Sequence, residues 1–120
     1  MKEEREYVRL DTAKDVRYKV LSEKGHLDSK SKNISAGGIR FFAKESLEPR
    51  GILDLVIYLG EEYKPVMAMG EVVWSRKLDK PIDSKEYEIG VKFTAIDKSD
   101  STKINEFVHR ETIKRRKGSS

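Results

Sequence analysis

The chain has 120 residues, enough for one domain with a single hydrophobic core. Apolar residues make up 37% and charged residues 38%, and the net charge of +4 suits an anionic ligand without by itself indicating nucleic-acid binding. The absence of cysteine excludes disulfides and thiolate metal sites. No apolar run approaches the length of a membrane span, and the N-terminus lacks a signal peptide's apolar stretch, so we expect a cytoplasmic protein.

Residues 1–12 are highly charged and weakly patterned, and we expect them to form a flexible N-terminal leader. Within it, Arg5 and Arg9 are four positions apart, so their side chains lie on the same side of an extended or a helical segment. Two guanidinium groups on one side suit paired phosphates or the O6/N7 edge of guanine. The RxxxR spacing alone is equally typical of a solvated, charged segment.

Alternating or apolar runs predict strands at residues 15–22, 27–34, 39–43, 52–59, 66–74 and 87–93, of which the polar second run is expected to be exposed. Turns are predicted at residues 23–25, 49–51 and 60–62, and residues 75–83 are interpreted as a polar loop containing Pro81. Gly70 indicates a bend or bulge within its strand. Trp74 is interpreted as a core residue more readily than as a platform for a ligand.

Residues 33–38 read Asn-Ile-Ser-Ala-Gly-Gly and join the end of the second predicted strand to the third. Gly37 and Gly38 can adopt positive φ, and Ser35 can hydrogen-bond the backbone just ahead of it, which predicts a sharp turn. The Asn33 amide, the Ser35 hydroxyl and the bare glycine backbone would form a polar corner that a ligand can approach. On turn chemistry alone, an ordinary hairpin turn is the simpler interpretation.

The pattern changes after the last predicted strand, where Asp97, Ser99 and Asp100 are candidate helix caps. Three apolar residues follow at helical spacing and can cover one end of a barrel: Ile104, Phe107 and Val108. Residues 114–117, Lys-Arg-Arg-Lys, lie near the helix C-terminus, where cations are favourable. A solvated helix end is the simpler interpretation of this run, although it could contact acidic lipid or nucleic acid. Residues 118–120 are expected to be a flexible tail.

In order, the chain contains RxxxR, then Asn-x-Ser-x-x-Gly, then a strand reading GEVVW, a strand reading EIGVKF and a closing helix. Together these features resemble the PilZ domain, a family of bacterial receptors for cyclic di-GMP, over about residues 3–110. The resemblance implies a mainly β fold, a small six-stranded antiparallel β-barrel with a C-terminal α-helix, over residues 13–117. It implies cyclic di-GMP as the ligand and six ligand-binding residues: Arg5, Arg9, Asn33, Ser35, Gly37 and Gly38. Many family members have a basic residue where this chain has Glu4, so the number of ligand molecules bound stays open.

The leading hypothesis is therefore a cyclic di-GMP receptor whose N-terminal segment changes conformation on binding and which signals through an unidentified partner protein. The alternative is a ligand-independent PilZ-like module that binds another protein. A small RNA-binding barrel would require exposed aromatics on one sheet face, which these strands do not clearly show, so no DNA or RNA partner is expected.

No residue pattern indicates catalysis. No serine lies in a nucleophile-elbow context, and no carboxylate pair lies in apolar surroundings. The two histidines, His26 and His109, are far apart in sequence and have no cysteines beside them. We therefore expect no enzyme, no metal and no cofactor, with cyclic di-GMP as a ligand only.

Overall fold

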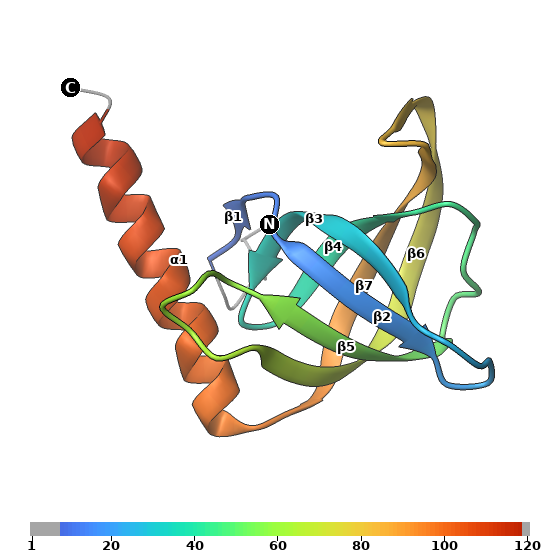
Figure 1. Ribbon diagram of the computed structural model, residues 1–120, viewed down its shortest axis with the longest axis horizontal. Coiled ribbons are helices and arrows are strands. Elements are labelled where there is room, and N and C mark those ends of the chain that lie inside the picture. Colours follow the sequence, from blue (N-terminus) through green and yellow to red (C-terminus); the bar gives the residue numbers. More distant parts are fainter. Residues whose placement is uncertain (1–7, 119–120) are drawn as a thin grey trace, which may run out of the picture.

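Short alternating strands form the wall of a barrel, and one amphipathic helix lies across its end (Figure 1). The structure, a computed structural model, describes residues 8–118. The strands are β1 (Leu10–Asp11), β2 (Asp15–Val20), β3 (Leu27–Ser35), β4 (Gly38–Ala43), β5 (Ile52–Tyr58), β6 (Val66–Ile82) and β7 (Lys85–Ile96). They are followed by the helix α1 (Lys98–Gly118).

Within these residues, six strands close into a ring in which every pairing is antiparallel. The order is β3-β2-β5-β6-β7-β4, and the additional pairing of β4 with β3 closes the barrel. Closure pairs the strands with neighbours on both sides around the core, whereas residues 73–82 of β6 pair only with β7. The predicted fold, a six-stranded antiparallel barrel with a C-terminal helix, is confirmed.

The core fills the barrel and is completed by α1. Alternate residues of the strands point inward, among them Val16 and Tyr18 of β2 and Phe41 of β4. Tyr18 packs against Phe41 with ring centroids 4.7 Å apart, and burial raises the pKa of Tyr18 to about 12. The helix begins directly after Asp97, a predicted cap, and covers the barrel end with the three predicted residues, Ile104, Phe107 and Val108. Between residues 8 and 118, no helix is both long and apolar enough to cross a membrane.

The structure moves the boundary of the N-terminal leader. Residues up to 12 were expected to have little structure, but Leu10 is only 5% exposed and belongs to the core. β1 pairs with the end of β3, with Leu10 opposite Ile34 and Asp11 opposite Asn33. This edge is available because β2 pairs only with residues 27–30 of β3. The predicted flexibility of the preceding part of the leader concerns residues 1–7, which lie outside the described residues.

Two other predictions are corrected. Residues 75–83 are not a polar loop, because β6 runs to Ile82 and β7 starts at Lys85. Asp83 and Ser84 have φ of 50° and 60°, as in a type I′ two-residue hairpin turn. The hairpin projects beyond the barrel, where its strands face no core and can be polar (Figure 1). At the C-terminus, α1 continues through Gly118, although residues 118–120 were expected to be a flexible tail. The bulge indicated by Gly70 is present as a register shift between Met69 and Gly70.

Candidate functional site

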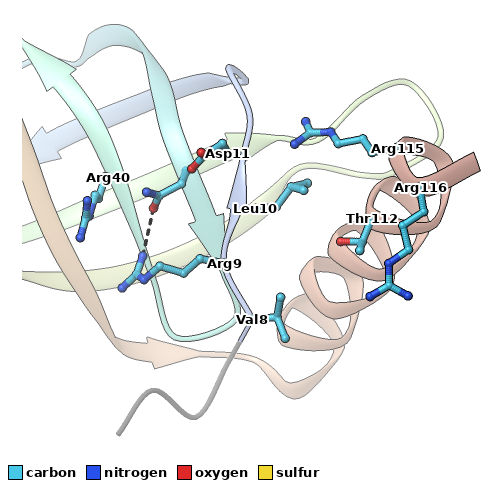
Figure 2. Close-up of a pocket in the computed structure, with 9 residues that line it drawn as sticks. Val8, Arg9, Leu10, Asp11, Arg40, Thr112, Arg115 and Arg116 are labelled. Carbon is cyan, nitrogen blue, oxygen red and sulfur yellow. Dashed lines mark hydrogen bonds between the residues drawn. The ribbon is translucent and has the colours of Figure 1, made fainter. Parts of the chain in front are cut away.

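The two predicted ligand motifs meet at β1. Because Asp11 pairs with Asn33, the residues just before β1 pass beside the start of the β3–β4 corner. There the Arg9 guanidinium donates a hydrogen bond from Nη1 to the Asn33 Oδ1 atom at 3.0 Å (Figure 2). Asn33 is 5% exposed, so β3 is less exposed at this point than predicted. The first predicted arginine, Arg5, lies outside the described residues.

The other motif residues shape the corner from inside. The Ser35 Oγ atom accepts hydrogen bonds from the backbone N–H groups of Gly37 at 3.1 Å and Gly38 at 3.2 Å. Ser35 and Gly38 are buried, whereas Gly37 is partly exposed. Gly38 does not have the positive φ that was anticipated. A Cβ atom there would lie 2.3 Å from the backbone oxygen of Val91, so glycine is required because β7 approaches so closely.

An open cavity of about 590 Å³ lies between β1, the adjacent barrel wall and the end of α1 (Figure 2). Its lining residues are Val8, Arg9, Leu10, Asp11, Asn33, Arg40, Thr112, Arg115 and Arg116. Among the described lining residues there are four arginines and one carboxylate, that of Asp11, so this lining is suited to an anion. Of the five predicted site residues that the structure describes, Arg9 and Asn33 are the ones that line it.

The sequence motifs did not identify Arg40, Arg115 and Arg116 as part of this cavity. For Arg40 a signal existed, because it is the outward position between the inward residues Ile39 and Phe41 and follows the corner directly. For the two helix arginines, nothing in the sequence indicated that the end of α1 lies beside β1. Their run is typical of a solvated helix end, and only the docking of α1 brings them beside β1.

A row of outward side chains continues from the corner across the barrel. Asn33 pairs with Arg40, Arg40 with Gly90, and Gly90 with Trp74, on β3, β4, β7 and β6 respectively. The Arg40 guanidinium lies 5.2 Å from the centre of the Trp74 ring, and that of Arg76 lies 5.6 Å from it. These are cation–π distances. Trp74 is partly exposed and lies outside the core cluster, so its interpretation as a core residue was wrong.

The indole ring lies directly against the backbone of Gly90. A Cβ atom at that position would be 2.3 Å from Trp74 Cε2 and 2.6 Å from Trp74 Nε1, too close for any side chain while the ring keeps this position. Gly90 is the glycine of EIGVKF, and Trp74 ends GEVVW. The two segments are therefore complementary in shape, which neither reveals when read alone.

A buried carboxylate holds this arrangement together. Glu88 is 1% exposed, and its Oε1 atom accepts a hydrogen bond from Arg76 Nη2 at 2.6 Å. Its Oε2 atom lies 3.9 Å from Arg40 Nη1. A buried charge requires such partners, and here both partners are the arginines beside Trp74. Among residues 8–118, no three His, Asp or Glu side chains gather closely enough to hold a metal ion.

Comparison with solved structures finds several proteins with the same architecture. The Bacillus subtilis inhibitor of motility, MotI/DgrA, superposes with a TM-score of 0.82 and 24% identity over 95% of this chain and 54% of its own. The PilZ domain of Escherichia coli YcgR with c-di-GMP gives 0.73 and 14%, over 98% of this chain and 99% of its own. The K. pneumonia MrkH–c-di-GMP complex gives 0.78 and 18%, over 97% and 56%.

At these identities the similarity shows a shared fold. The chain spans about half the length of the MotI/DgrA and MrkH chains and nearly the whole of the YcgR domain. Comparison with curated proteins gives no match. The family model described as PilZ domain matches residues 3–110, which includes both arginine positions, the corner, the barrel and most of α1. This protein therefore belongs to the PilZ domain family.

Proposed function

We propose that this protein is a cyclic di-GMP receptor, rather than an enzyme, and binds its ligand in the cavity beside β1. The observation that carries the proposal is the hydrogen bond between Arg9 and Asn33, because it brings both ligand motifs to one wall of an arginine-lined cavity. Family membership supports it, and the similar YcgR and MrkH structures are described as having c-di-GMP bound.

The chemistry of the cavity fits both kinds of group in this ligand, the phosphates and the guanine bases. Cyclic di-GMP has two anionic phosphates and two guanines, whose O6/N7 edges accept paired hydrogen bonds from a guanidinium. Arg9 and Arg40 offer planar donors of that kind from opposite sides of Asn33. A ligand between Arg9 and Asn33 replaces the neutral amide acceptor of Arg9 with anionic phosphate oxygens or a guanine edge. Trp74 extends the same surface beside Arg40 with an aromatic ring.

Ser35, Gly37 and Gly38 form the opposite wall in this proposal. The Ser35 hydroxyl holds the turn through both glycine N–H groups, so it keeps the corner in one shape as the ligand arrives. Gly37 is the partly exposed member and presents its backbone at the surface. Loss of the Ser35 hydroxyl would act on the ligand through the shape of this turn as well as through direct contact.

The proposed signal is a rearrangement of the segment that carries Arg5. β1 anchors that segment at Leu10, so the residues before Val8 can close over the corner without disturbing the barrel. Ordering a segment of backbone costs about 1–2 kcal/mol per residue, so such a rearrangement reduces ligand affinity accordingly, while charge-assisted bonds from Arg5 and Arg9 to the ligand favour it. A partner protein then recognises the closed surface and not the open one.

Calorimetric titration with cyclic di-GMP at near-physiological salt tests the proposal. The natural chain should bind, and Arg9→Ala should weaken binding at least about tenfold, the loss of one hydrogen bond to a charged group. Arg17→Ala is the matched control, because Arg17 pairs with Asp28 on the barrel surface and does not line the cavity. Absence of binding up to high micromolar ligand would reject the receptor and favour the ligand-independent interaction module. Backbone amide exchange over residues 3–9, with and without ligand, tests the rearrangement.

A further inference from the structure

The last turns of α1 extend past the barrel that the rest of the helix covers. The buried helix residues, Ile104, Phe107 and Val108, all lie in the first half of α1. None of the residues from 109 to 118 is buried, and the ribbon continues beyond the barrel wall (Figure 1). The last turns of α1 therefore contribute no residue to the barrel core.

The helical repeat places Arg115 on the face that meets the barrel. Arg115 follows Val108 by seven residues, and Val108 follows Ile104 by four, so the three lie in one stripe along the helix. Lys114 does not line the cavity, and its Nζ atom lies 3.3 Å from Glu111 Oε2. Beyond the core, a position in line with these buried residues is therefore occupied by Arg115.

Figure 2 shows how Arg115 lies relative to β1 and the other arginines of the cavity. Arg9 and Arg40 lie on the barrel side of β1, and Arg115 extends from the helix toward β1 from the other side. Arg116 lines the helix side of the same cavity. The carboxylate among the lining residues is that of Asp11, so positive charge is concentrated around one opening from three separate elements. An anion seated over β1 is attracted by all of these guanidinium groups.

We propose that Arg115 and Arg116 are ligand-binding residues and that α1 forms a third wall of the cyclic di-GMP site. The inference rests on the proposed function, since it assigns further residues to the same cavity. Contacts from the ligand's anionic groups to Arg115 hold the end of the helix against β1. Ligand binding is thereby communicated to α1 as well as to the N-terminal segment.

The test compares two double variants of the same four-residue run. Arg115→Ala/Arg116→Ala removes two charges that line the cavity, and Lys114→Ala/Lys117→Ala removes two that do not. Alanine favours helix, so neither change disrupts α1, and circular dichroism checks this. In calorimetric titration with cyclic di-GMP, the arginine variant should bind at least about tenfold more weakly. The lysine variant should stay within about twofold of the natural chain.

A second measurement follows amide exchange of residues 112–118. Cyclic di-GMP should slow their exchange in the natural chain and not in the arginine variant. Equal weakening by both double variants would overturn the proposal, because it would show a general effect of net charge. Unchanged affinity of the arginine variant would also overturn it while leaving the receptor function standing. Failure of the natural chain to bind would instead reject the receptor function, and the third wall with it.

Discussion

Gly90→Ala should displace Trp74 and thereby test the packing beneath the proposed ligand surface. The added Cβ atom would lie 2.3 Å from Trp74 Cε2, 2.6 Å from Nε1 and 2.7 Å from Cζ2. Carbon atoms in contact are about 3.5–4.0 Å apart, so the ring must move by more than about 1 Å. Its movement also weakens the contacts with Arg40 and Arg76. Because Trp74 is partly exposed, it can swing outward, and we expect a loss of about 1–3 kcal/mol in the free energy of unfolding.

The assay is urea unfolding followed by fluorescence, since Trp74 is the single tryptophan of the chain. In folded Gly90→Ala the emission should shift to longer wavelength as the ring becomes more exposed to water. A double-mutant cycle with Trp74→Ala, followed by circular dichroism, then isolates the contact. Without the indole, alanine at position 90 should cost less than about 0.5 kcal/mol, because a permitted Gly→Ala change restricts the unfolded chain.

Equal destabilisation by Gly90→Ala with and without the indole would refute this reasoning. Gly38→Ala provides the contrast, because its Cβ atom would meet the backbone oxygen of Val91 at 2.3 Å. No side-chain movement relieves that clash. The cost of Gly38→Ala should therefore be larger than that of Gly90→Ala and should not depend on whether Trp74 is present.

Three further outcomes are expected. Arg9→Lys should weaken cyclic di-GMP binding in calorimetry nearly as much as Arg9→Ala, because lysine keeps the charge and loses the planar fork; unchanged affinity would show that charge alone matters. Arg76→Ala should lower the free energy of unfolding by about 1–3 kcal/mol, because it removes the hydrogen bond to the buried Glu88, and adding Glu88→Gln should restore part of that loss in urea titrations. Tyr18 has its pKa raised to about 12, so the folded state favours the protonated phenol and stability should fall between about pH 10 and 12. Over that range the natural chain should lose about 2–3 kcal/mol more than Tyr18→Phe, and parallel pH profiles would contradict this.

The sequence by itself determined the local character of most elements. Period-2 alternation marks which side of each strand is buried, and the change to helical spacing marks the residues that close the barrel end, Ile104, Phe107 and Val108. These signals are strong because burying apolar side chains is favourable. Each strand or helix therefore shows in its own residue pattern which side is buried. The two motifs, one containing Arg9 and the other the corner residues, could likewise be recognised in the sequence, because the residues of each motif are close neighbours in the chain.

The tertiary structure decided which segments contact one another, because residue patterns within single elements do not show this. A polar segment can be a loop or a hairpin that extends beyond the core, so residues 75–83 were misassigned. Leu10 became a core residue only because β3 is longer than its pairing with β2 and leaves an edge for β1. Trp74 is outward-facing, and hydrophobic periodicity carries no information about which outward surfaces meet. Strand register across the closed barrel sets the row from Asn33 to Trp74, and the docking of α1 brings Arg115 to the cavity, because both depend on contacts between residues far apart in the chain.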